Sequence, residues 1–505
     1  MTTTLIEVKQ ARCRIGRRRL LTVEQLSIRQ GENWCVFGPN GAGKTLLAEL
    51  LAGQRNESGS YARYAPDFDP TAHCLWVSFE AQQHLWQRDN RLDISDYRED
   101  AQDVGTRVED LISNVRSQCQ QEQATLTDLI KSLDLEAIAH KGIRFLSSGQ
   151  MRRALLARAL YGGLAEENRL VILDDPLESI DRGSRQQIQD CIASARERGM
   201  TSLELCRRAR DLPIGCSHLA VMKNLGLLAA GPFDRISKGE TFQNLIESRP
   251  QIPARLPIST PGSQSPEPET KLIELHAVRA SFGPQQVLKD VDWTMLSSEH
   301  VLIEGPNGCG KSTLLSLIDG ENHKGYGQDV SLFGKRKGSG ESVWEIKAQF
   351  GVVSNELHNK YIKGWRVLDV VVSGFFDSVG LYDDSGSAEQ HTALAWLDAI
   401  GLQDARREYY HELSFGQQRL VLLARAMVKE PRILILDEPC VGLDDYYRQL
   451  VLGILDRIAD LSPTRLIYVT HDPGEYPSSM TTSLQFVDDG GGGYRLISQP
   501  IQPRM

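Results

Sequence analysis

Short apolar runs separated by polar segments recur along the chain. Their length and branched side chains are typical of strands that are buried on both faces. The run before a glycine-rich loop is followed by STLLSLI, which predicts a helix. Strands that alternate with helices in this way predict an α/β fold with a largely parallel sheet. The buried strands are expected at LVILD (170–174), VLIEG (301–305), ILILD (433–437) and LIYVT (466–470).

Membrane-spanning segments are not expected, because no run approaches the roughly 18 uninterrupted apolar residues that a spanning helix needs. The N-terminal MTTTLIEVKQARCRIGRRRL also lacks the apolar core of a signal peptide. If the chain serves transport, the pore must therefore belong to another chain. We expect a cytoplasmic protein, with a peripheral position at the inner face of the plasma membrane if it serves such a pore.

Composition narrows the candidate chemistry. The formal net charge of −9 argues against nucleic acid as a general partner, although a local basic patch is compatible with it. The nine cysteines are scattered and form no Cys-x-x-Cys pair, so we expect neither a zinc nor an iron–sulfur site. An odd, dispersed set of cysteines also fits a reducing cytosol.

An internal repeat dominates the sequence. GPNGAGKT (38–45) returns 267 positions later as GPNGCGKS (305–312), and LSSGQ (146–150) returns at the same offset as LSFGQ (413–417). An apolar strand that ends in two carboxylates follows in each half, at an offset of 263. Three ordered motifs at near-constant spacing predict two copies of one domain. The predicted domains are 1–246 and 271–505, joined by a Pro/Ser-rich linker at 247–270.

The glycine-rich segments match the P-loop pattern, in which backbone N–H groups curl around phosphate oxygens at a helix N-terminus. The lysines are expected to reach the β- and γ-phosphates of ATP. A simple glycine-rich turn is the other interpretation, but two matches between a strand and a helix favour phosphate binding. The predicted nucleotide-binding residues are Gly38, Pro39, Asn40, Gly41, Ala42, Gly43, Lys44 and Thr45, and Gly305, Pro306, Asn307, Gly308, Cys309, Gly310, Lys311 and Ser312.

Mg²⁺ is the expected companion of ATP. The hydroxyls of Thr45 and Ser312 are predicted to bind the ion, and Asp174 and Asp437 to hold its hydration shell. A strand that merely ends in a polar turn is the simpler interpretation of these two carboxylates. Their place downstream of a P-loop favours the metal.

LSSGQ and LSFGQ each precede a strongly helical segment. Ser147 and Ser414 are good helix N-caps, which is compatible with phosphate binding at the same helix start. The order of P-loop, LSxGQ and apolar strand with D[DE]P resembles the ABC ATPase family across nearly the whole chain.

That resemblance implies two P-loop NTPase cassettes, each with a mainly parallel sheet core and a helical subdomain. It also implies an intramolecular sandwich, in which each ATP is held by the P-loop of one cassette and the signature of the other. The signature residues would be Ser147, Ser148, Gly149 and Gln150, and Ser414, Phe415, Gly416 and Gln417. Asp181 and Asp444 match the D-loop position.

The second half carries the family's hydrolytic residues. Glu438 matches the general base, His471 the switch histidine that touches the γ-phosphate, and Phe282 the aromatic that stacks on adenine. For Phe282, a core aromatic is a serious competing interpretation. The first half differs from the second at each of these three places, and Asp175 stands there in place of the glutamate.

Ile15 replaces the aromatic, and an arginine, Arg207, is expected in place of the histidine. The Asp175 side chain is one methylene shorter, so its carboxylate would sit about 1.5 Å back from the water. We therefore predict an asymmetric ATPase with one strong and one degenerate site. The alternative is that Asp175 works adequately and both sites turn over.

Within the ABC proteins, the segments at 331–354, 370–384 and 78–83 resemble the photorepair-type, or ModF, family of molybdenum-transport ATP-binding proteins. That resemblance implies an ATPase that energises a separate integral membrane permease, for molybdate or another small solute. The alternative is a soluble ABC ATPase that acts on the ribosome or on nucleic acid.

Overall fold

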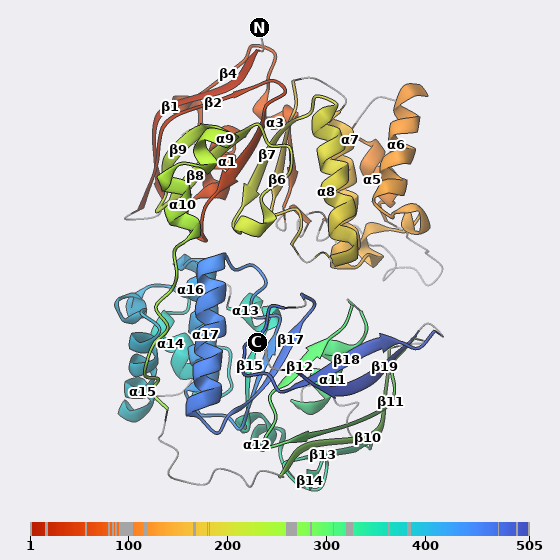
Figure 1. Cartoon of the computed structure of the whole chain (residues 1–505), viewed down its shortest axis with the longest axis vertical. Helices are drawn as coiled ribbons and strands as arrows, with labels where there is room; N and C mark the ends of the chain where they lie inside the picture. The colour runs from red at the N-terminus through yellow and green to blue at the C-terminus, as the bar shows by residue number, and fades with distance from the viewer. Residues whose placement is uncertain are drawn as a thin grey trace. The chain divides into compact units, whose positions relative to one another are not determined.

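The computed structural model divides the chain into two compact units, residues 1–248 and 249–505, which we describe separately. Figure 1 shows their helices and strands. The structure describes residues 3–15, 19–55, 58–78, 81–82, 85, 88–89, 105–115, 120–164, 168–178, 180, 182–258, 270–282, 285–306, 308–319, 327–361, 364–380, 385–472, 474–490 and 493–502.

The described strands of the first unit form one sheet with the order β4-β1-β2-β9-β8-β3-β7-β6-β5. The strands from β8 to β5 pair in parallel, and β1, β2 and β4 pair antiparallel at the other end. The run TSLELC of β7 is buried along its whole length, as a strand covered on both faces should be. The strands are β1 (Thr4–Ile15), β2 (Arg19–Arg29), β3 (Asn33–Phe37), β4 (Ala62–Tyr64), β5 (Cys74–Val77), β6 (Leu170–Asp174), β7 (Thr201–Cys206), β8 (His218–Lys223) and β9 (Gly226–Pro232).

Helices of the first unit lie against this sheet and form a separate helical layer. The apolar sides of α5, α6 and α7 meet in one buried cluster, while α1 packs into the cluster beneath the sheet. In Figure 1, α5 and α6 lie beside α7. The helices are α1 (Lys44–Leu51), α2 (Ser58–Tyr61), α3 (Pro70–His73), α5 (Val108–Ser113), α6 (Gln120–Ser132), α7 (Ser148–Gly163), α8 (Arg182–Glu197), α9 (Phe233–Ser237) and α10 (Glu240–Ile246).

The second unit repeats this plan with two described sheets. The core sheet has the order β15-β16-β17-β12-β18-β19, in which all neighbours pair in parallel except β18 with β19. An antiparallel sheet has the order β11-β10-β13-β14. The strands are β10 (Lys271–Phe282), β11 (Gln285–Leu296), β12 (Val301–Glu304), β13 (Asp329–Leu332), β14 (Lys335–Arg336), β15 (Phe350–Val353), β16 (Ile433–Asp437), β17 (Arg465–Thr470), β18 (Thr482–Asp488) and β19 (Tyr494–Pro500).

A helical layer also flanks the core sheet of the second unit. α14, α15 and α16 share one buried cluster with α17, and α16 is buried almost all round. The helices are α11 (Lys311–Ile318), α12 (Val343–Ala348), α13 (Asn355–Lys360), α14 (Val367–Val372), α15 (Ser387–Ala399), α16 (Phe415–Met427) and α17 (Asp445–Leu461).

The predicted fold class is therefore confirmed: each unit has a mainly parallel core sheet and its own helical layer. Over the residues that the structure describes, no helix combines the length and apolarity needed to cross a membrane.

Part of the segment expected as a linker packs on the second unit. Leu256 and Ile258 contact its helical cluster, and the Arg457 guanidinium donates to the carbonyl oxygen of Ala254 at 2.7 Å. Ile252 lies against Gly453 of α17, where a Cβ would come within 2.4 Å of its side chain. Residues 259–269 of the segment lie outside the described residues.

The helical layer of the second unit offers a test of the packing. Leu397 of α15 is fully buried in the cluster that α14 and α16 share. Leu397→Ala should lower the free energy of unfolding of this unit by about 2–5 kcal/mol, because the neighbours cannot close the cavity. Calorimetry of the full chain measures the loss. The exposed neighbour Asp398 is the control, and Asp398→Ala should change stability by no more than about 0.5 kcal/mol. Equal losses in the two variants would contradict the packing described.

Candidate nucleotide site

The loop between β3 and α1 closes around the side chain of its own lysine. Lys44 Nζ donates to the carbonyl oxygens of Gly38 at 2.8 Å and Pro39 at 3.1 Å. Gly43 has φ 95°, a left-handed conformation that favours glycine, and a Cβ on Gly38 would lie 2.5 Å from the carbonyl oxygen of Met222. The loop therefore depends on glycine at both positions. Asn40, Gly41, Ala42 and Thr45 belong to the same segment.

The loop between β12 and α11 repeats this geometry. Lys311 Nζ donates to Gly305 O at 2.8 Å and to Pro306 O at 2.9 Å. Gly310 has φ 111° and precedes α11 directly. Asn307 lies outside the described residues. Gly308, Cys309 and Ser312 complete the predicted segment.

A hydroxyl and a carboxylate face each other beside each loop. Thr45 Oγ1 donates to Asp174 Oδ2 at 3.3 Å, and Ser312 Oγ donates to Asp437 Oδ2 at 3.5 Å. Burial, helped by the adjacent carboxylate, raises the pKa of Asp174 to about 7 and that of Asp437 to about 6. Desolvated negative charge beside a hydroxyl is a fitting partner for a divalent cation.

Mg²⁺ fits these residues, since it binds through few carboxylates and keeps waters and phosphate oxygens in its shell. Across the described parts of the chain, no group of three or more His, Cys, Asp or Glu side chains gathers as a metal cage. The ion would therefore be held at Thr45 and Asp174, or at Ser312 and Asp437, together with the nucleotide.

In the second unit a carboxylate and an imidazole meet at the ends of two neighbouring strands. Glu438 follows β16 with φ 50°, and its N–H donates to Val469 O at 3.1 Å. His471 follows β17, and its Nδ1 lies 2.9 Å from Glu438 Oε1. Burial alone would raise the pKa of Glu438, but the hydrogen bond and charge of His471 hold that pKa below its usual range. Glu438 therefore stays ionised beside the P-loop.

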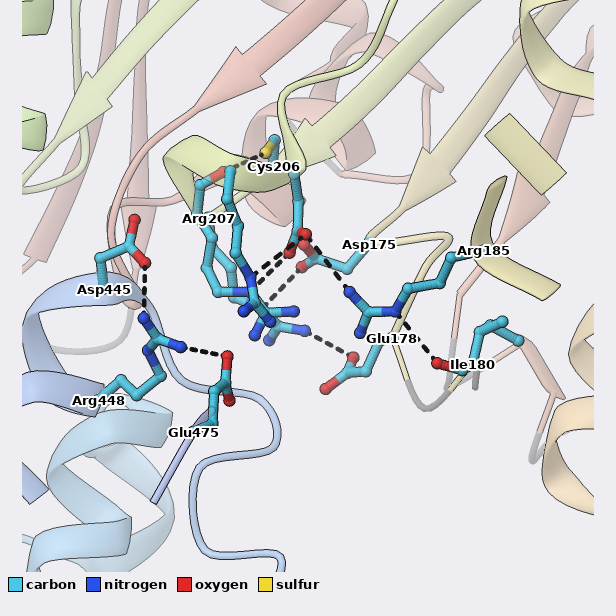
Figure 2. A network of polar contacts seen from close by, with 12 residues as sticks. Asp175, Glu178, Ile180, Arg185, Cys206, Arg207, Asp445, Arg448 and Glu475 are labelled. Atoms are coloured by element: carbon cyan, nitrogen blue, oxygen red, sulfur yellow. Dashed lines mark hydrogen bonds and ion pairs between the residues drawn. The ribbon is translucent and has the colours of Figure 1, made fainter. Parts of the chain in front are cut away.

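The first unit puts an arginine where the second has the histidine (Figure 2). Asp175 has a positive φ of 44°, as Glu438 does, and its N–H donates to Leu205 O at 3.2 Å. Arg207 Nε lies 3.3 Å from Asp175 Oδ2, and Arg207 Nη2 lies 2.7 Å from Glu178 Oε2. The structure thus brings Arg207 to the place that the sequence suggested.

The charges of Arg207, Asp175 and Glu178 shift one another's pKa values. Burial opposes the charge of Arg207, but Asp175 and Glu178 together raise the pKa of its guanidinium. Burial raises the pKa of Asp175 against the opposing effect of Arg207, whereas for Glu178 the arginine prevails and the pKa is lowered. The strand end therefore carries a paired guanidinium where the second unit has an imidazole.

Two features of the site were missed by sequence reasoning. Glu178 stands where the repeat has Val441, so a comparison of the two halves would have revealed the extra carboxylate. Arg152 donates to the carbonyl oxygens of Asp174 and Asp175, at 2.8 and 2.6 Å. Its repeat counterpart Arg419 instead donates to Asn355 Oδ1.

Both signature segments begin a helix through a reciprocal capping box. Gln150 N–H donates to Ser147 Oγ at 3.3 Å, and Ser147 N–H donates to Gln150 Oε1 at 3.0 Å. Ser414 and Gln417 repeat the pair at 3.4 and 3.0 Å. The capping interpretation therefore holds, and phosphate binding by the same residues stays a prediction. The side chain of Ser148 lies outside the described residues; Gly149, Phe415 and Gly416 lie in the first turns of their helices.

The remaining predicted residues are placed only in part. Asp444 is buried and caps α17, accepting from Tyr447 N–H at 2.8 Å. Asp181 lies outside the described residues. Phe282 ends β10 and Ile15 ends β1, but their side chains lie outside the described part, so stacking on adenine stays a prediction.

Comparison with known proteins agrees with this geometry. The family model described as ABC transporter matches residues 21–178 and 288–441. The ABC transporter ATP-binding protein ModF of Escherichia coli is 33% identical over 96% of this chain and 97% of its own length. An uncharacterized ABC transporter ATP-binding protein of Schizosaccharomyces pombe is 26% identical over 91% of this chain and 93% of its own.

Among solved structures, one titled RNase-L Inhibitor covers 98% of this chain and 90% of its own, with a TM-score of 0.56 and 18% identity, a likeness of fold alone. The P-loops, the paired strand ends and the family match lead to one conclusion. The chain belongs to the ABC transporter ATP-binding family and carries two of that family's ATPase cassettes in tandem.

Proposed function

We propose that the chain binds ATP at both P-loops and hydrolyses it at the site that Glu438 and His471 define. The site of the first cassette would mainly hold ATP. The supporting observation is that equivalent strand ends carry a carboxylate–histidine pair in one cassette and a carboxylate–arginine pair in the other. The family resemblance adds that the signature of each cassette completes the site of the other.

Hydrolysis needs a group that orients water and accepts its proton as the oxygen attacks the γ-phosphorus. Glu438 is ionised, half-buried and fixed through its backbone to β17, so its carboxylate is available for this role. His471 uses Nδ1 for Glu438, which leaves Nε2 as the ring nitrogen to contact the γ-phosphate. The bond to the bridging oxygen then breaks, and ADP and phosphate leave. Bound Mg²⁺ would neutralise charge on the β- and γ-oxygens.

The first cassette is less suited to this step. Arg207 pairs with both Asp175 and Glu178. The Asp175 side chain is one methylene shorter than that of Glu438, so its carboxylate would lie farther from the attacking water. A guanidinium also stays protonated at neutral pH, so it cannot accept a proton from the attacking water. The competing interpretation is that Arg207 stabilises charge on the γ-phosphate, as arginine does in other phosphoryl transfers, and that both sites turn over.

Paired carboxamide substitutions distinguish these interpretations. Glu438→Gln should lower the steady-state ATPase rate by at least about 100-fold, because the general base is lost. Asp175→Asn, the same isosteric change in the other cassette, should lower it less than about threefold. Phosphate release measures both rates, and equilibrium dialysis with ATP confirms that both variants still bind nucleotide. Equal loss of activity from the two changes would refute the proposal that only the second cassette's site is strongly hydrolytic.

The work that ATP performs depends on a partner. We propose a separate integral membrane permease, which the ModF resemblance supports, with molybdate as a candidate cargo. No helix in the described part of the chain is able to cross a membrane, so a transport role would need such a chain. The alternative is a ribosome or nucleic acid partner.

Purification of the tagged chain with Glu438→Gln should retain partners that bind the ATP-bound form. We expect an integral membrane protein in the detergent-solubilised eluate when ATP is present, and its loss when ATP is omitted. The matched control is Lys311→Ala in the same background, which removes the lysine that we expect to reach the phosphates and that donates to Gly305 O in the P-loop. Recovery of ribosomal proteins or RNA in place of a membrane protein would overturn the permease proposal.

A further inference from the structure

An arginine one turn into α17 links two segments that flank the site of the second cassette. Arg448 pairs with the carboxylate of Glu475 and lies 3.9 Å from Asp445, as Figure 2 shows. Its backbone N–H donates to the carbonyl oxygen of Asp444, the residue that matches the D-loop position, at 3.0 Å. Glu475 lies four residues after His471, in the segment that leaves β17. The ion pair therefore connects the D-loop end of α17 to the histidine segment.

Both partners of this pair are largely withdrawn from solvent. The side chains of Arg448 and Glu475 are 18% and 9% exposed. Glu475 N–H donates to Asp472 O at 3.2 Å, and Asp472 N–H donates to Thr470 Oγ1 at 3.0 Å. A displacement of Glu475 would therefore act on Asp472, the residue next to His471.

The first cassette contains a comparable but longer contact, between Arg185 and Asp211, and Asp211 also pairs with Arg208 at 2.6 Å. Arg185 of α8 lies 3.6 Å from Asp211. Its Nε donates to the carbonyl oxygen of Ile180 at 3.1 Å (Figure 2). Asp211 lies four residues after Arg207, and its N–H donates to Arg208 O at 3.1 Å, which repeats the hydrogen bond from Glu475 N–H to Asp472 O.

The repetition is informative because the neighbouring residues have diverged. The switch residue is His471 in one cassette and Arg207 in the other, and the carboxylate beside it is glutamate or aspartate. The arginine-to-carboxylate connection persists in both. A largely buried ion pair contributes little net stability, since desolvation offsets its attraction, so stability alone is a weak reason for its presence in both halves.

We propose that Arg448 and Glu475 are positioning residues that couple the D-loop end of α17 to His471 and so hold the imidazole at Glu438. Arg185 and Asp211 form the corresponding coupling in the first cassette. This inference rests on the proposed hydrolytic role of the second cassette. Arg448 and Glu475 act through His471 and need not touch the nucleotide.

Three variants of the full chain test this coupling by kinetics. Glu475→Gln and Arg448→Met should each lower kcat about tenfold and change KM for ATP less than about threefold, because the histidine is misplaced while the P-loop is intact. The exchanged double variant, Arg448→Glu with Glu475→Arg, should have a kcat at least about threefold higher than that of either single variant.

The matched control removes an ion pair of similar burial elsewhere in the unit. Lys429, which follows the C-terminal end of α16, pairs with Asp377. Their side chains are 10% and 20% exposed. Asp377→Asn should leave kcat within about twofold of the parent chain. If Glu475→Gln also stays within this range, or if its loss matches only a smaller folded fraction, the coupling is refuted.

A second measurement judges the coupling without ATP turnover. In chains labelled with [¹³Cε1]histidine, the His471 signal is assigned by its disappearance in His471→Ala. Glu475→Gln should shift that signal, and Asp377→Asn should not. An unchanged His471 signal in Glu475→Gln would overturn the inference whether or not the chain hydrolyses ATP. A wild-type chain that binds but does not hydrolyse ATP, with the shift present, would refute the proposed function alone.

Discussion

Each cassette holds two consecutive, half-buried carboxylates at the end of a central strand, and this negative charge must be balanced from neighbouring elements. Burial and the adjacent carboxylate raise the pKa of Asp174 and of Asp437, so the ionised form of each is unfavourable unless a cation lies nearby. The P-loop lysine supplies part of the compensation in each unit. The second carboxylate of each pair takes its partner from the next strand, and there the two cassettes differ.

The order of parallel strands explains why these groups meet. β12 lies beside β17, and β17 beside β16, so the P-loop, His471 and the carboxylates leave the same edge of the sheet. The first unit repeats the arrangement with β3, β7 and β6. Because carboxyl ends of parallel strands face one edge, a single substitution after β7 changes the chemistry beside Asp175. Arg207 is such a substitution, and Glu178 provides its second anionic partner.

Much of the core followed from the sequence, since short buried runs and glycine loops depend on local patterns. The strands that end at Asp174 and Asp437, and the helices that begin at Lys44 and Lys311, agree with those patterns. Contacts between segments that are distant in the sequence could not be predicted from such local patterns. The pair of Arg448 with Glu475 joins residues 27 positions apart, which no local period marks. The packing of the Pro-rich segment at 249–258 on the second unit also depends on a tertiary surface that composition does not encode.

A single-turnover measurement tests the proposed inequality of the two sites most directly. The chain is saturated with [γ-³²P]ATP in the absence of Mg²⁺, then mixed with Mg²⁺ and excess unlabelled ATP and quenched with acid over time. The account predicts that about one phosphate per chain forms in a fast phase and the second in a phase at least about tenfold slower. Release of two phosphates per chain in one phase, at a single rate, would contradict it.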